Sequence, residues 1–349
     1  MSTADPTMKD HVRKWAPRIG FPIFYVVSFL LFLTLVFPYD ALRVRIVTTF
    51  NSQQRAAGAQ QQLAIDEMGF YWFTGVRAKG IRLTSAPQEL GKPPTEIRID
   101  DAKIRISLLG LMLGRKDVTF RLETLGGVVD GEYEERGKDR NIEVNLDNVE
   151  LKQVDALTQM LGLPVEGHIS GSIILALPEG KASKGSGTVT LEATDVAIGD
   201  GKAKLKGALE MPKLSVGTLT FNAEAKDGVL KITKFSAGGK DLELNGDGKV
   251  QMRELATESN LDINLKFKIN DAFRGKSDIT KSLFGAPGSP KGGDVELFVP
   301  EMKKAKRTDG FYAFHVRGLL GKPGFDPQGT IGGTSPTTAF GNPGTGGFP

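Results

Sequence analysis

The residue types that most often carry catalysis are sparse in this chain. There are three histidines, His11, His168 and His315, and none has a second histidine or a carboxylate at metal-ligand spacing. Cysteine is absent, which excludes disulfides, thiolate metal sites and thiol catalysis. We therefore expect no catalytic residues, no metal and no cofactor, and we expect that the protein is not an enzyme.

Glycine motifs and paired acidic residues give no stronger indication of a catalytic or binding site. The chain holds neither a GxxxxGK[ST] phosphate loop nor a GxSxG nucleophile elbow. Gly246 and Gly248, in NGDGKV, lie inside a strand pattern, which favours a bulge or a turn over a nucleotide site. The adjacent acids Asp100-Asp101 and Glu134-Glu135 would point to opposite faces of a strand and cannot share a proton. We interpret both pairs as ordinary solvated residues.

Charge and composition exclude further classes of protein. The 349 residues include 45 basic and 41 acidic side chains, a net charge of +4, and the two signs are mixed along the chain. Nucleic acid is therefore not an expected partner. The 40% of hydrophobic residues suffices for one large domain or two ordinary ones, while 43 glycines and 18 prolines indicate many tight turns and an unfolded segment.

One uninterrupted apolar run stands out from the rest of the chain. Residues 19–39, IGFPIFYVVSFLLFLTLVFPY, contain no charged side chain. As a helix this run would extend roughly 31 Å, about the thickness of the hydrocarbon core of a bilayer. We predict a single transmembrane anchor over residues 19–39, preceded by a cytoplasmic tail of residues 1–18. The residues of the run that we expect to anchor the chain include Ile19, Phe24, Phe29, Leu33 and Phe37.

A cleavable signal peptide is the competing interpretation of this run. Such a peptide has an apolar core of only about 7–15 residues, followed by small residues at the cleavage site. Cleavage after Ala41 would place Tyr39 where a small side chain is required. We therefore favour a retained anchor. The N-terminus would be cytoplasmic and the long C-terminal part periplasmic, because long domains translocate largely regardless of charge.

Beyond the run, most of the chain alternates apolar and polar side chains, as strands require. The segments TEIRIDDAKIRISLL, DVTFRLET and NIEVNLDN show this period in the first half, and the stripe from Leu261 to Ile269 shows it in the second. Asp227-Gly228 is typical of a two-residue hairpin turn. Short breaks between strands indicate antiparallel meanders. We predict a mainly β domain over residues 63–321, an elongated and curved antiparallel sheet that closes, stacks on a second sheet or forms an open trough.

A few segments depart from the alternation. Residues 40–62 predict a juxtamembrane helix, and residues 153–161 predict a short helix. SLLGLMLG, after Ile106, is compatible with a short helix or a broad turn. We thus expect one or two short helices within the β domain. The aromatic residues 70–73 would lie either in a core or at the level of lipid headgroups.

The C-terminal residues 322–349 are rich in Gly, Pro, Thr and Ser and lack periodicity, so we predict a disordered tail. Residues 285–293, GAPGSPKGG, predict an internal loop of similar character.

The candidate functional surface is the apolar face of the predicted sheet. The simpler interpretation is a filled core. The functional interpretation is a groove for acyl chains or an apolar partner. The residues proposed for this groove are Leu242, Leu244, Leu261, Ile263, Leu265, Phe267 and Ile269.

Several passages together resemble a known family. They are the anchor followed by FYWFTGVRAKGIRL, the passage LKQVDALTQMLGLPVEGHISGSIIL, and the late passages KDLELNGDGKVQMRELATESNLDINLKFKI and FYAFHVRGLLGKP. Over about residues 15–325 the chain resembles the type II secretion system protein N (GspN) family in its long bacterial form. More distantly, it is similar to the AsmA-like group of anchored periplasmic β proteins. No catalytic signature is among these cues.

The resemblance implies two functions. The GspN family implies a structural, non-catalytic inner-membrane accessory component of type II protein secretion, with other inner-membrane secretion proteins as partners. The AsmA-like group implies an alternative, a trough- or sandwich-shaped carrier that conducts lipid acyl chains along an apolar groove in the periplasm. The membrane is a partner in both, and lipid is a partner in the second.

Overall fold

The computed structural model of the protein describes most of the chain, in segments. They are residues 21–22, 24–25, 27–29, 31–32, 36–56, 61–72, 74–85, 95–154, 157–158, 161–202, 204–205, 209–289 and 292–329. The described residues between 21 and 36 are helical. Within the described part of the chain, no helix is both long and apolar enough to cross a membrane. The predicted anchor therefore stays a prediction, and two of its residues, Ile19 and Leu33, lie outside the described residues.

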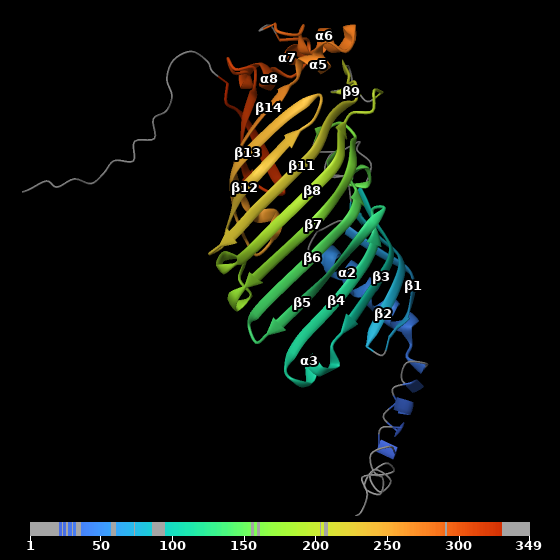
Figure 1. Ribbon diagram of the computed structural model, residues 1–349. Coiled ribbons are helices and arrows are strands. Elements are labelled where there is room, and N and C mark those ends of the chain that lie inside the picture. Colours follow the sequence, from blue (N-terminus) through green and yellow to red (C-terminus); the bar gives the residue numbers. More distant parts are fainter. Residues whose placement is uncertain are drawn as a thin grey trace, which may run out of the picture.

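A single antiparallel sheet of fourteen strands dominates the described residues (Figure 1). Each strand pairs with its neighbours in the sequence, except that β8 pairs with β11 because β9 and β10 form a separate pair. The strands are β1 (Gln61–Tyr71), β2 (Gly75–Ser85), β3 (Thr95–Ile106), β4 (Arg115–Thr124), β5 (Gly127–Arg136), β6 (Asp139–Glu150), β7 (Val165–Leu177), β8 (Ser186–Ile198), β9 (Lys204–Leu205), β10 (Leu209–Glu210), β11 (Leu214–Lys226), β12 (Val229–Gly238), β13 (Leu242–Gln251), β14 (Asn260–Ile269), β15 (Tyr312–Leu319) and β16 (Lys322–Pro327).

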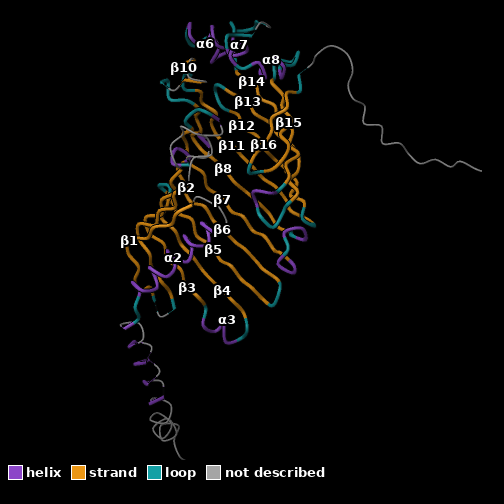
Figure 2. Tube along the Cα trace, turned by 180° about the vertical axis from the view of Figure 1, so that it is seen from behind, coloured by secondary structure: helices purple, strands orange, loops and turns teal. Residues whose placement is uncertain are grey.

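The helices lie at the two ends of this sheet. They are α2 (Tyr39–Ala56), α3 (Leu108–Met112), α5 (Asp271–Arg274), α6 (Asp278–Phe284), α7 (Val295–Phe298) and α8 (Pro300–Ala305). Figure 2 shows the sheet from behind as a curved surface, with α2 lying inside the curve next to β1. Helices α5–α8 gather at the opposite end, beside β14 and β15 (Figure 1).

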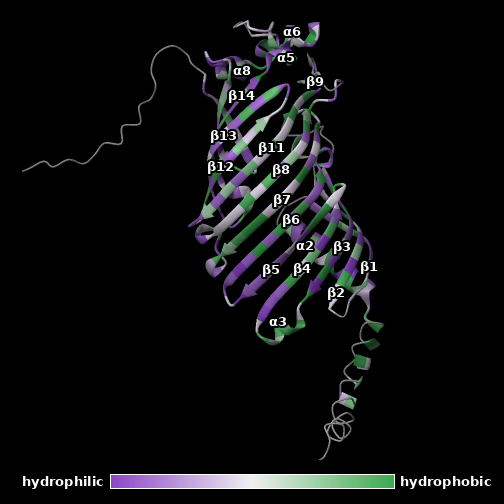
Figure 3. Ribbon diagram, in the orientation of Figure 1, coloured by the Kyte–Doolittle hydropathy of each residue, from purple (hydrophilic) through white to green (hydrophobic). Residues whose placement is uncertain are grey.

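Hydrophobic and hydrophilic residues alternate along strands of the sheet, as Figure 3 shows by its colours, and alternating residues point to opposite faces. The hairpin turns follow their expected chemistry. Asp227 and Gly228 both have positive φ, 50° and 77°, as the predicted two-residue turn requires. This turn and the mainly β, antiparallel fold are confirmed.

Two clusters of buried residues form the core. The larger contains Leu214, Leu242, Ile269 and, from the helices, Phe273 and Phe284. The smaller contains Ile65, Ala78 and Ala102, and Val47 of α2 packs against it. Helices thus cover the apolar face of the sheet near each of its ends.

Helix α2 also covers the free edge of the sheet. Asn51 accepts a hydrogen bond from the Leu63 N–H at 2.7 Å and donates one to the Leu63 carbonyl at 3.1 Å. Arg43 donates to the carbonyls of Ile65 and Asp66 at 3.1 and 2.9 Å. Since β1 is the first strand of the sheet, these side chains satisfy backbone groups that would otherwise be open to pairing.

Several predicted boundaries were wrong. The helix predicted over residues 40–62 ends at Ala56, and Gln61 already belongs to β1. The tail predicted from Lys322 begins with a strand, because Lys322–Pro327 pairs with β15. The sheet therefore spans residues 61–327 rather than 63–321, and residues 330–349 lie outside the described residues.

The helix content also differs from the prediction of one or two short helices. SLLGLMLG forms helix α3, and α5–α8 follow β14. In the helix predicted over residues 153–161, residues 157, 158 and 161 are helical, while 155, 156, 159 and 160 lie outside the described residues.

The contact between α2 and β1 is testable with Asn51→Ala. This change removes both hydrogen bonds to Leu63, so we expect a loss of about 1–2 kcal/mol in the stability of this edge. Hydrogen exchange at the Leu63 amide should accelerate by about tenfold, which corresponds to 1.4 kcal/mol. Thr48→Ala, on an exposed position of the same helix, is the control. Unchanged exchange at Leu63 in Asn51→Ala would refute the edge-capping role.

Candidate functional site

Two rows of side chains cross strands β3–β7 on the apolar face of the sheet. In each row the residues are direct partners in the strand register, so their side chains lie side by side. We call these side chains the open apolar face. The first row is Ile106, Val118, Tyr133, Ile142 and Leu175, and the second is Ile104, Phe120, Gly131, Val144 and Ile173.

The open apolar face is less covered than the rest of the core. Ile104 is 44% exposed and Ile106 is 39% exposed, and the other side chains of the two rows are half-buried. In the described part of the chain, neither buried cluster includes any of these residues. The middle of the sheet therefore presents a contiguous apolar surface that extends over five strands.

Glycine residues on the sheet leave room for the rings of neighbouring aromatic residues. A Cβ atom on Gly131 would lie 2.8 Å from the ring of Phe120 and 2.1 Å from the Glu143 carbonyl oxygen. The Phe120 ring thus lies over the backbone of β5, where any side chain would collide with it. Gly246, at the other end of the sheet, has the same relation to Phe235, at 2.5 Å. Glycine at these positions lets aromatic rings lie flat on the sheet.

The residues predicted to form a groove lie mostly in filled core. Leu242 and Ile269 are 5% and 7% exposed within the larger cluster, and Leu244 and Phe267 pack against it. Leu261 is 8% exposed, while Ile263 and Leu265 are half-buried. The structure does bring all seven to one face of β13 and β14, where Leu242 pairs with Ile269 and Leu244 with Phe267. Helices α5 and α6, through Phe273 and Phe284, cover the Leu242 end of this stripe.

The predicted anchor residues that the structure describes are exposed. Phe24, Phe29 and Phe37 are 64%, 62% and 41% exposed on helical or adjacent backbone. They make no contribution to either core cluster of the described residues.

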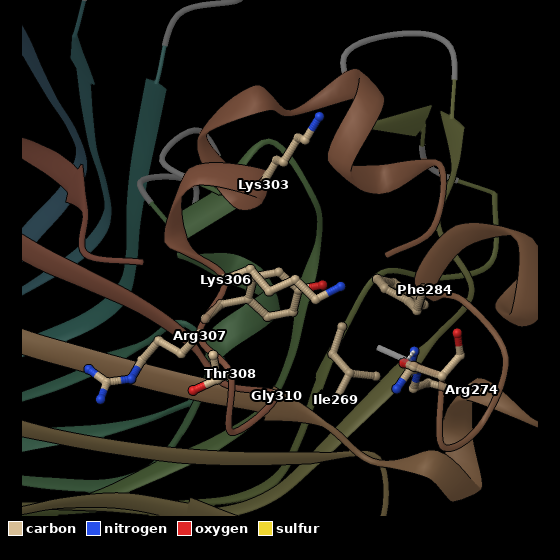
Figure 4. Close-up of a pocket in the computed structure, with 10 residues that line it drawn as sticks. Ile269, Arg274, Phe284, Lys303, Lys306, Arg307, Thr308 and Gly310 are labelled. Atoms are coloured by element: carbon tan, nitrogen blue, oxygen red, sulfur yellow. Dashed lines mark hydrogen bonds between the residues drawn. The ribbon is translucent and has the colours of Figure 1, made fainter. Parts of the chain in front are cut away.

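A cavity of about 380 Å³ lies at the end of the apolar face, between β14, β15 and the helices (Figure 4). Apolar lining residues include Ile269 and Phe284, and four lining residues are basic. Figure 4 shows the Lys306 side chain crossing the cavity, while Lys303 and Arg307 lie at its rim.

The two central cations of this cavity are held by internal bonds. Lys306 lies 2.8 Å from Glu296, and the Tyr312 hydroxyl donates to the same carboxylate oxygen at 2.8 Å. Burial, and then this bond to Glu296, raise the pKa of Tyr312. Arg274 donates to the carbonyls of Gly285 and Ser289 at 3.2 and 3.1 Å. The cavity is therefore a polar cap on the core rather than a free cluster of positive charge.

The titratable residues singled out from the sequence form no site. His315 lies 2.9 Å from the carboxylate of Asp262 on the neighbouring strand, within hydrogen-bond distance, and His168 is exposed on β7. His11 lies outside the described residues. No group of three potential metal ligands gathers anywhere in the described segments.

Asp101 corrects the interpretation of Asp100-Asp101 as ordinary solvated residues. It is 5% exposed and lies 2.5 Å from Arg77 and 2.8 Å from Lys103. Burial pushes its pKa upward, but the hydrogen bonds to Arg77 and Lys103 outweigh burial and hold the pKa below its usual value. A β-bulge between Ile99 and Asp101 breaks the simple alternation, which the sequence pattern did not indicate.

The open apolar face was missed as a site although its residues were recognised as strand residues. Alternation shows which side chains share a face, but not what covers that face. The feature of the sequence that could have indicated the uncovered strands was the position of the long segments without a strand pattern. About forty residues with helical or loop character follow Ile269 and can cover β13 and β14, whereas β3–β6 are joined by shorter connections, the longest being residues 107–114.

Comparisons of the chain with family models, with curated proteins and with solved structures give no match. The resemblance to the GspN and AsmA-like groups therefore rests on the sequence passages alone.

The difference between covered and open parts of the face predicts different mutational costs. Leu242→Ala should destabilise the protein by about 2–5 kcal/mol, because it empties a filled core position. Ile104→Ala should cost less than about 1 kcal/mol, because its side chain is nearly half exposed. Chemical unfolding of the two variants measures this difference. Equal losses would mean that the open apolar face is in fact covered.

Proposed function

We propose that the protein binds the acyl chains of membrane lipids on the open apolar face, while residues 19–39 anchor the chain in a membrane. This is the lipid carrier expected from the AsmA-like resemblance. The observation that carries it is the contiguous, partly exposed apolar surface across β3–β7. Soluble proteins rarely expose such surfaces unless they bind an apolar partner.

The dimensions of the open apolar face suit an acyl chain. Five adjacent strands span four inter-strand spacings, roughly 19 Å. One leaflet of a bilayer has a hydrocarbon thickness of about 15 Å, half of the whole core. Two parallel rows of aliphatic and aromatic side chains can therefore line one extended acyl chain. Each methylene group removed from water contributes about 0.8 kcal/mol.

The curvature supports a trough rather than a sandwich. The only other sheet among the described residues is the two-stranded pair β9–β10, which is too small to cover fourteen strands. Figure 2 shows the sheet curving around α2, and α2 packs against β1 and the smaller cluster.

Site-specific photo-crosslinking tests the proposal. A benzophenone amino acid at Ile104 in the full-length protein should capture phospholipid in cells, detected by mass spectrometry of the adduct. The same probe at Arg105 is the matched control, because Arg105 lies on the same strand with its side chain on the opposite face. Lipid capture at both positions, or capture of a protein at Ile104, would refute the proposal.

Lipid content of the purified protein gives a second, independent measurement. Ile104→Gln with Ile106→Gln should lower the co-purified phospholipid, because two amides replace apolar contacts without emptying a buried position. Arg105→Gln should leave it unchanged. The Leu265 and Phe267 positions are unsuitable for this test, since Phe267 packs against the core.

The role in type II secretion that the GspN resemblance implies stays a separate prediction. It depends on partner proteins rather than on the open apolar face. Deletion of the gene distinguishes the two. Trapped exoproteins in the periplasm with normal lipid traffic would favour the secretion component, and the opposite outcome would favour the lipid carrier.

A further inference from the structure

The connection between β3 and β4 exposes a group of large apolar side chains. Within this loop, Leu108–Leu113 consists of five large apolar residues and Gly110. Their exposed fractions are 48% for Leu108, 67% for Leu109, 47% for Leu111, 84% for Met112 and 64% for Leu113. Figure 3 shows this hydrophobic group at α3, at the lower end of the molecule.

The fold of the loop does not depend on burying these side chains. Ser107 caps α3 by accepting a hydrogen bond from the Gly110 N–H at 3.1 Å. The Ser107 N–H in turn donates to the Asp117 carbonyl at 2.9 Å, which fixes the loop on β4. Gly110 faces Asp117 so closely that a Cβ atom there would lie 2.5 Å from its carboxylate. The side of α3 without a side chain therefore packs on the sheet, and the leucines project away.

The loop lies at the same end of the molecule as two other apolar features. Arg105 pairs with Gly75, so α3 is adjacent to the β1–β2 hairpin, whose tip carries Trp72 at 61% and Phe70 at 47% exposure. Arg43 binds the backbone of Ile65 and Asp66, so the N-terminal part of α2 lies toward the same hairpin. The described helical residues between 21 and 36 precede α2 and project from this end (Figure 1). Three apolar groups from separate parts of the chain thus share one end.

Basic side chains lie next to these groups. Arg115 and Lys116 follow the loop directly, and Lys138 lies in the neighbouring β5–β6 turn. Arg115 forms an ion pair with Asp117, and Lys116 forms one with Glu135. Among the described residues, Arg105 and Lys138 make no ion pair. Apolar side chains flanked by exposed cations match the boundary between acyl chains and anionic headgroups.

We propose that Leu108–Leu113, together with Trp72, insert into the surface of a lipid bilayer and fix the sheet against it. The occupant of this end is the membrane, because the apolar segment that precedes α2 leaves the protein at the same end and the flanking charge is positive. This proposal does not rest on acyl-chain binding by the open apolar face.

The absence of cysteine gives a clean experiment, since one introduced cysteine is the only labelling site. Met112→Cys in the full-length protein is labelled with bimane and reconstituted into vesicles of phosphatidylethanolamine and phosphatidylglycerol. Lipids that carry a nitroxide at two depths should quench the label and place it about 5–10 Å below the headgroup level. Lys202→Cys, in the exposed turn after β8, is the control and should stay unquenched.

A second variant tests whether the quenching depends on the apolar side chains of the loop or arises from non-specific adsorption. Leu109→Glu with Leu113→Glu changes two exposed positions, so the fold should persist, as circular dichroism would check. In this background the label at position 112 should lose its quenching and match the label at position 202. A label at Met112→Cys that is no better quenched than the Lys202→Cys label would overturn the proposal. Quenching that persists in the double glutamate variant would overturn it as well.

Discussion

The structure depends on one constraint, which is that a meander of antiparallel strands collects the alternating apolar side chains of its strands on a single face. Fourteen strands in near-sequential order produce one very long face of this kind. A sheet folded as a sandwich would cover it with a second sheet, and a closed barrel would fill it with its own side chains. Here the described residues provide helices instead, and these cover only parts of the face. The side chains between the covered parts remain accessible.

The same helices solve a second problem, the open edges of the sheet. At the first strand, Asn51 and Arg43 of α2 bind backbone groups of β1. At the last strand, β16 contains Pro323 and Pro327, which cannot donate a hydrogen bond and so suit an edge position. Helix α8 lies against this strand. These helices, together with Leu151 and Leu163 of the connection between β6 and β7, cover parts of the face, while the two rows across β3–β7 join neither cluster.

The sequence predicted the strands well because alternation is a local property. Ile97, Ile99, Val118, Phe120 and Ile142 all belong to strands as their spacing indicated. The strand formed by KPGFDP escaped prediction because its pairing with β15, not its composition, holds it in the sheet. The burial of Asp101 escaped for the same reason, since Arg77 and Lys103 reach it across the sheet and along its own strand. The groove residues were proposed from alternation, which does not show what covers a strand, so the choice between a filled core and a groove stayed open. Nothing in the stripe from Leu261 to Ile269 indicates that Phe273 and Phe284 lie over its end.

The two proposed surfaces are contiguous, which bears on how they would work together. Ile106 and Val118 are register partners in the first row of the open apolar face, and Ser107 and Asp117, the residues next to them, close the base of the α3 loop. A lipid acyl chain that left a bilayer in contact with Leu109 and Met112 would therefore have only the base of the loop, at Ser107 and Asp117, between it and Ile106. Such continuity lowers the cost of transfer, since each methylene group exposed to water on the way would cost about 0.8 kcal/mol. On this argument, the membrane contact and the open apolar face form a single apolar path that begins at the bilayer and runs across β3–β7.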